Sequence, residues 1–144
     1  MRLILALALL PFPALAWEFS PDPMCTLTHQ AEDVEIAITY DSALPQYTLF
    51  ITLRSGEWPN AAGFQMFFGG RRDVTIGTTR HSLSTDSATL TVLDSGFGNV
   101  LDGLEFNDTV VSTSGATTVI ADLSNAAPAV QAFRDCPADL PATS

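Results

Sequence analysis

The sequence predicts an all-β fold, an antiparallel β-sandwich or flattened barrel of about seven or eight strands with one C-terminal helix. Three observations favour it. Apolar and polar residues alternate along most of the chain, which is the two-residue period of half-buried strands. Glycine, proline, asparagine and aspartate separate these runs at short intervals, as turns require. Only the stretch from residue 124 onward follows the longer period of a helix.

The clearest strands form a predicted hairpin. Residues 34–40 alternate apolar with polar side chains, residues 41–45 contain turn formers, and residues 47–53 resume the alternation. Two such runs joined by a short turn are typical of paired antiparallel strands. The glycine-rich residues 95–103 are expected to form a loop with a short helical turn near Val100. Further strands are expected near Cys25 and over residues 64–68, 74–78, 89–92, 104–111 and 116–123.

The predicted helix lies at the end of the chain. Ser124 or Asn125 provides the N-cap, and Pro128 fits the first turn, where its missing N–H has no helical partner. Pro137 is expected to stop the helix. Three residues at helical spacing form its apolar face: Ala127, Val130 and Phe133.

The first 16 residues have the pattern of a cleaved secretory signal. Arg2 precedes an apolar run from Leu3 to Leu10, and Ala14-Leu15-Ala16 supplies the small residues of a cleavage site. The run is too short to span a bilayer. We therefore expect a signal peptide over 1–16, a single β-rich domain over 17–137, and a flexible tail over 138–144. The expected location is the periplasm or the exterior of a Gram-negative bacterium.

Charge excludes several functions. The 144 residues include 16 acidic side chains and six arginines but no lysine, which gives a net charge of −10. Removal of the signal leaves about −11. Without lysine there is no Walker A loop and no lysine Schiff base. Nucleic-acid binding needs clustered basic residues, so it is not expected. The acidity predicts either simple solubility or a face for a cationic periplasmic partner protein.

Two cysteines lie at opposite ends of the domain, Cys25 and Cys136. In an oxidising compartment a lone pair of this kind usually forms a disulfide. Closing a loop of roughly 110 residues contributes about 4–5 kcal/mol in the chain-entropy model. A metal or redox pair is the alternative, but such pairs usually have closer spacing or further ligands.

No catalytic motif stands out. The chain has two histidines, His29 and His81, and no G-x-S-x-G elbow. We expect a non-catalytic binding or interaction module with an acidic surface. A small periplasmic hydrolase that uses His81 or a carboxylate pair is the alternative.

Metal ligands are present without a metal-site spacing, so no cofactor is expected. Copper takes imidazole and thioether ligands, and calcium takes oxygen ligands. The candidates are His29, His81, Met24 and Met66 for copper, and Asp94, Asn99 and Asp102 for calcium.

One region is dense in aromatic and basic residues. Trp58, Phe67, Arg71 and Arg72 form a candidate binding patch for an anion or a partner protein. Core packing of the aromatic side chains and solvation of the arginines is the competing interpretation.

Three blocks carry a family resemblance: residues 17–25, 96–106 and 132–137. They resemble small exported proteins of marine alphaproteobacteria that have no established activity and often carry the name of the excinuclease ABC helicase. The likeness runs through most of the mature chain, and the closing strand and helix are more loosely similar to invasion-associated locus B proteins. The excinuclease helicase is a large cytoplasmic DNA-repair protein with a Walker A lysine, so this lysine-free chain does not support that activity. The resemblance implies a periplasmic, β-rich protein with paired cysteines.

The paired cysteines can be tested directly. We expect the folded protein to resist thiol alkylation until it is denatured and reduced, because both sulfurs are bonded to each other. Intact mass spectrometry after alkylation, with and without reductant, checks this. Alkylated thiols in the unreduced folded protein would contradict the pairing.

Overall fold

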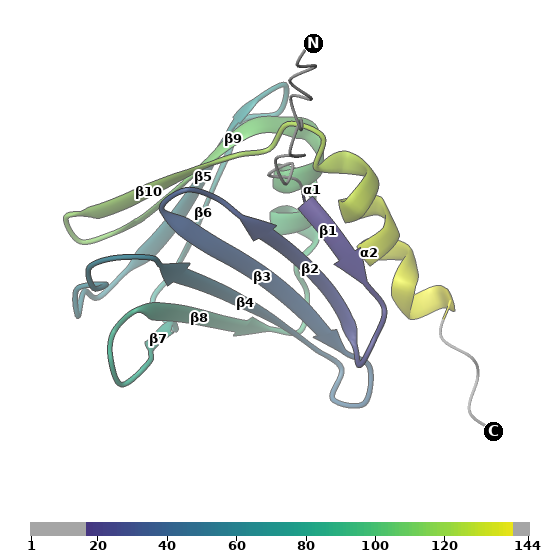
Figure 1. The fold of residues 1–144 in the computed structure, drawn as a ribbon, viewed down its shortest axis with the longest axis horizontal. Helices are drawn as coiled ribbons and strands as arrows, with labels where there is room; N and C mark the ends of the chain where they lie inside the picture. The colour runs from purple at the N-terminus through teal and green to yellow at the C-terminus, as the bar shows by residue number, and fades with distance from the viewer. Residues whose placement is uncertain (1–16, 140–144) are drawn as a thin grey trace, which may run out of the picture.

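Two antiparallel sheets and two helices make up the computed structural model, which describes residues 17–139. The predicted signal peptide and residues 140–144 of the predicted tail lie outside the described residues. A six-stranded sheet has the order β1-β2-β3-β4-β8-β7, and a four-stranded sheet has the order β10-β9-β5-β6 (Figure 1). The elements are β1 (Trp17–Ser20), β2 (Cys25–Gln30), β3 (Val34–Asp41), β4 (Gln46–Leu53), β5 (Phe64–Gly70), β6 (Val74–Thr78), β7 (Ser82–Leu83), β8 (Thr89–Asp94), α1 (Gly98–Phe106), β9 (Asn107–Ser114), β10 (Thr117–Asp122) and α2 (Ala127–Asp139).

The large sheet follows the alternation of its strands. The predicted hairpin is confirmed as β3 and β4, with Ile38 opposite Leu49. Leu27 continues the same row on β2, opposite Ile38. These three side chains are buried, while their sequence neighbours face outward and are mostly threonine. One face of the large sheet therefore forms one side of the core.

The small sheet supplies the other side of the core. Phe64, Met66 and Phe68 on β5 are buried at every second position, as a half-buried strand requires. Between them, Gln65 and Phe67 point to the outer face and are exposed. The chain forms a β-rich two-sheet fold, which confirms the all-β prediction in its coarse form.

Closure into a barrel does not occur within residues 17–139. Each sheet keeps two edge strands, β1 and β7 in the large sheet and β10 and β6 in the small one. Strands β1 and β7 are the short ones that the sequence pattern did not separate. A two-residue strand such as β7 is defined by its partner β8, with Leu83 opposite Leu90, rather than by a period of its own.

The prediction of a single helix is wrong, because α1 replaces the expected loop and the start of the expected strand over 104–111. The pattern misled because Leu104 and Phe106 continue the alternation of the strand that follows. In the structure Val100, Leu101 and Leu104 are buried on one side of α1, which is helical spacing. The backbone switches from helix to strand at Asn107, whose side-chain amide donates to the Gly103 carbonyl (3.0 Å).

The predicted C-terminal helix is present as α2, and it buries Val130 and Phe133. It does not stop at Pro137 but continues to Asp139. A proline removes only its own N–H bond, and so near a C-terminus it ends few further helical bonds. Helix α2 packs against α1, β1 and β2, and Figure 1 shows it beside β1 at one end of the large sheet.

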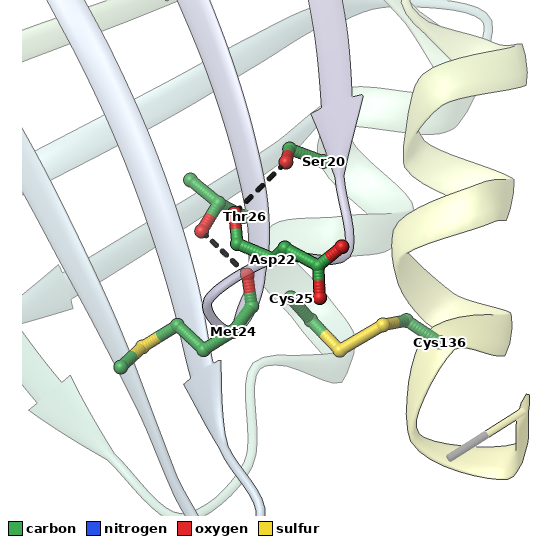
Figure 2. The surroundings of a disulfide bond; sticks show 6 residues. All are labelled: Ser20, Asp22, Met24, Cys25, Thr26 and Cys136. Carbon is green, nitrogen blue, oxygen red and sulfur yellow. Dashed lines mark hydrogen bonds between the residues drawn. A yellow bond between two sulfur atoms is a disulfide. The ribbon is translucent and has the colours of Figure 1, made fainter. Parts of the chain in front are cut away.

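The disulfide is confirmed. Cys25 opens β2 and Cys136 lies in the last turns of α2, 111 residues away in the sequence, with their sulfurs bonded at 2.02 Å. Figure 2 shows the bridge beside the turn between β1 and β2, where the Ser20 and Thr26 hydroxyls donate to main-chain oxygens of the turn (3.0 and 2.9 Å). The bond ties the helix to the β1–β2 end of the large sheet. Among the described residues, no helix is long and apolar enough to cross a bilayer.

Gly103 offers a test of the packing of α1. A Cβ at this position would lie 2.5 Å from the Phe68 ring, whereas a Cβ at Gly98 in the same helix would meet nothing within 4 Å. We expect Gly103→Ala to lower the free energy of unfolding by about 1–3 kcal/mol, because the buried ring has no room to move. Gly98→Ala, the matched control, should leave it unchanged or slightly higher. Urea denaturation measures both, and equal effects would contradict the contact.

Candidate functional site

The aromatic and basic residues of the predicted patch do not share one surface. Trp58 is only 2% exposed, packs edge-on against Phe64 (6.3 Å between ring centroids), and donates its indole N–H to the Ile51 carbonyl (3.0 Å). A tryptophan whose N–H has a partner inside is a core residue. The structure therefore takes Trp58 out of any exposed patch.

The other patch residues are exposed but separated along the small sheet. Phe67 is 43% exposed in the middle of its outer face, in register with Val111 of β9. Arg71 and Arg72 lie in the turn after β5. The Arg72 guanidinium sits 4.5 Å from the centre of the Phe106 ring, a cation–π contact.

His29 belongs to the packing of β1. It is 4% exposed, and its ring stacks on Trp17 at 4.6 Å between centroids. The Trp17 indole N–H donates to the main-chain carbonyl of Asp122 (3.1 Å). Hydrogen bonds from Ser124 lower the pKa of the Asp122 carboxyl, with a smaller contribution from the charge of His29. The arrangement links β1 to the end of β10.

His81 lines a shallow cleft of about 510 Å³ together with Asn60, Ser82 and Ser87. Its ring centroid is 6.3 Å from that of Phe64. The Nδ1 atom is buried, and within residues 17–139 it has no hydrogen-bond partner. A catalytic histidine is normally bonded to a nucleophile on one side and an orienting group on the other. Among the described residues, Nδ1 of His81 therefore lacks the orienting group of a catalytic histidine.

The metal candidates are spread out. Over residues 17–139, no three His, Cys, Asp or Glu side chains gather as ligands would. Of the calcium candidates, Asp102 pairs with Arg134, and Asp94 accepts the Ser95 N–H (2.7 Å). Both carboxylates therefore have partners within the protein.

A cavity between the two sheets is the feature that sequence reasoning missed. We call it the slot. It has a volume of about 110 Å³ and lies where β6 of the small sheet faces β8 of the large one. Its lining is mainly apolar, with one cation and one anion: Leu49, Phe64, Met66, Ile76, Gly77, Thr78, Arg80, Val92, Leu93, Asp94, Phe97 and Val100.

The slot exists because this side of the sandwich is not covered. Strand β7 pairs only with Leu90 and Thr91, so among the described strands none lies beside the last residues of β8 on that side. Strand β6 is the edge of its own sheet. Consequently Ile76 and Val92, which point toward the core side, remain only half-buried. No local pattern announces the slot, since its walls come from β4, β5, β6, β8 and α1.

A second cleft, of about 450 Å³, opens at the opposite edge of the small sheet and is acidic. Asp33 and Glu57 lie on one side of it, and Val119 and Ile120 of β10 on the other. None of the arginines in the described part of the chain lines it. It combines two carboxylates with exposed apolar surface.

An aromatic cluster joins the helices to the large sheet. Tyr47 stacks with Phe97 (5.3 Å) and lies 4.5 Å from Tyr40 and 6.1 Å from Phe133, measured between ring centroids. Burial raises the pKa of Tyr47, and Tyr40 adds to the rise, while the charge of Arg134 opposes it. The Arg134 guanidinium pairs with Asp102 and with Glu105 (3.1 Å), which connects α2 to α1.

Comparison of the chain with family models, with curated proteins and with solved structures finds no match. The resemblance drawn from the three sequence blocks therefore stays a prediction. What the protein binds has to be argued from the geometry of the slot and its surroundings.

The Tyr47 environment predicts an alkaline titration. Tyr40 and Tyr47 are the two tyrosines of the chain, so Tyr40→Phe leaves Tyr47 as the sole tyrosinate signal. The Tyr47 pKa should stay above the ordinary value of 10.0, because burial is the largest cause of its rise. Adding Arg134→Leu should raise this pKa further, since it removes the opposing charge.

Absorbance titration of the tyrosinate measures these midpoints, and Arg54→Leu, at an arginine of the β4–β5 loop, is the control. A neutral group with a raised folded pKa stabilises the fold below its unfolded pKa, and this stability is lost as pH rises through the folded pKa. A Tyr47 midpoint at or below 10.0 in Tyr40→Phe would contradict the assignment.

Proposed function

We propose that this protein is an exported, non-catalytic binding module that accepts an apolar group of a partner in the slot. The observation that carries the proposal is the apolar cavity at an uncovered side of the sandwich. Apolar surface left open to solvent at a concave site is typical of binding sites. The slot is thus the place where a ligand group gains most by leaving water.

Its size limits what enters. A cavity of about 110 Å³ is somewhat smaller than an engineered cavity of about 150 Å³ that holds benzene. One branched aliphatic side chain or one small ring therefore fits, and a drug-sized ligand does not. This favours an anchoring side chain of a larger partner over a free metabolite.

Export is supported by the disulfide, since structural disulfides are typical of oxidising compartments. The periplasmic location and the signal peptide are part of the proposal. The hydrolase alternative gains no support from His81, whose buried Nδ1 has no partner among the described residues.

A second candidate function keeps the predicted cationic partner. The acidic cleft places Asp33 and Glu57 next to the apolar side chains of β10. A lysine or arginine of a basic periplasmic protein would pair its charge with the carboxylates and lay its aliphatic stem on the apolar wall. Binding of this kind weakens with salt.

Small apolar probes test the slot. We expect toluene to shift the backbone amide NMR signals of β6, β8 and the start of α1 in a saturable manner. Val92→Phe should abolish these shifts, because the larger ring occupies the slot. Val119→Phe, the same change in the acidic cleft, is the matched control and should preserve them. Shifts scattered over the surface, or shifts that survive Val92→Phe, would overturn the proposal.

A further inference from the structure

The arginines are distributed unevenly. Residues 17–139 hold five of them. Arg54 donates to the Ala31 carbonyl (2.7 Å) and to Gln30, and Arg134 pairs with two carboxylates of α1. The other three form no ion pair within these residues, and all lie at the ends of β6: Arg71, Arg72 and Arg80.

Strand β6 itself carries nothing that blocks pairing. Its sequence Val-Thr-Ile-Gly-Thr has no charge and no proline, and among the described strands one of its sides has no neighbour. An edge of this kind presents N–H and C=O groups to another chain, and proteins usually protect it with charges, proline or a bulge. In β6 the charges stand just outside the strand, so the strand is open between two positive ends.

Pairing of β6 with a second copy of itself is disfavoured by these charges. An antiparallel pair centred on Ile76 would put Arg72 of one copy opposite Arg80 of the other. Like charges directly opposite each other destabilise a pair of strands. The same arrangement favours a strand with negative charges at both ends.

We infer that β6 accepts an extended acidic segment of a partner protein by strand addition, with one apolar side chain of that segment in the slot. The inference rests on the proposed function, because the slot is where the added strand buries its anchor. Backbone bonds to an exposed edge provide affinity in this mode, and pockets for alternate side chains provide specificity. The Ile76 side chain is half-buried in the slot wall, so an added strand would complete its cover.

The spacing of the charges sets the length of the segment. Arg72 and Arg80 stand eight positions apart, about 26 Å in extended chain. Carboxylates at both ends of a core of about five to seven residues would meet them. Asp73 and Asp94 lie nearby, but each accepts a main-chain N–H of its own turn (Gly70, 2.8 Å, and Ser95, 2.7 Å). Exposed acids farther away are screened beyond about 8 Å at physiological salt.

Synthetic peptides are the probe. The parent peptide is fluorescein-labelled, has two glutamates at each end, and has a core of alternating threonine and leucine. The matched peptide has lysines in place of the glutamates. By fluorescence anisotropy we expect the acidic peptide to bind at least tenfold more tightly than the lysine peptide. Equal affinities of these two peptides would overturn the role of the arginines.

Strand addition has a signature that simple charge attraction lacks. Two further peptides carry N-methyl groups on alternate core amides, one on the odd positions and the other on the even positions. Only the set whose amides face β6 should lose binding, at least tenfold, because the other set faces solvent. Equal affinities of the two methylated peptides would overturn strand addition.

Protein variants separate the outcomes. Arg71→Glu with Arg72→Glu and Arg80→Glu should weaken the acidic peptide at least tenfold, while Arg54→Glu, away from β6, should change it less than twofold. Toluene binding without peptide binding would overturn this inference and leave the proposed function standing. Absence of toluene binding in the unmodified protein would overturn both.

Discussion

The close contact between Gly103 and the Phe68 ring is the constraint on which the candidate site depends. Because Gly103 has no side chain, α1 lies directly on the small sheet. The residue before the helix, Phe97, stacks on Tyr47 of the large sheet, so the same segment reaches both sheets. Phe97 and Val100 then form part of the slot lining. A shift of α1 would therefore change the slot as well as the core.

Local elements of the fold were predictable from the sequence, and the site was not. The β3–β4 hairpin depends on adjacent runs and one turn, so its pattern is contained in one stretch of chain. The slot depends on which strand lies beside which. That β8 joins β4 while β6 joins β5 is decided by packing between distant residues. Trp58 illustrates the same limit, since composition alone does not distinguish a core indole from an exposed one.

The net charge of the chain also hid a local difference. An excess of acids predicts a surface for cationic partners, and the cleft with Asp33 and Glu57 fits that expectation. The arginines that form no ion pair within residues 17–139 nevertheless gather around one strand. Strands β10 and β6 are opposite edges of the same sheet, so the small sheet has an acidic cleft at one edge and a basic boundary at the other.

The two sides of the large sheet are stabilised differently. At the β1–β2 side, α2 covers the sheet and the Cys25–Cys136 bond closes a loop of 111 residues. In the chain-entropy model such a closure contributes about 4–5 kcal/mol, a large share of the roughly 5–15 kcal/mol that a domain has. At the β7–β8 side, no comparable cover exists within the described residues. Stability supplied at the closed side allows the other side to keep apolar surface and a free strand edge, which are the features that a binding partner requires.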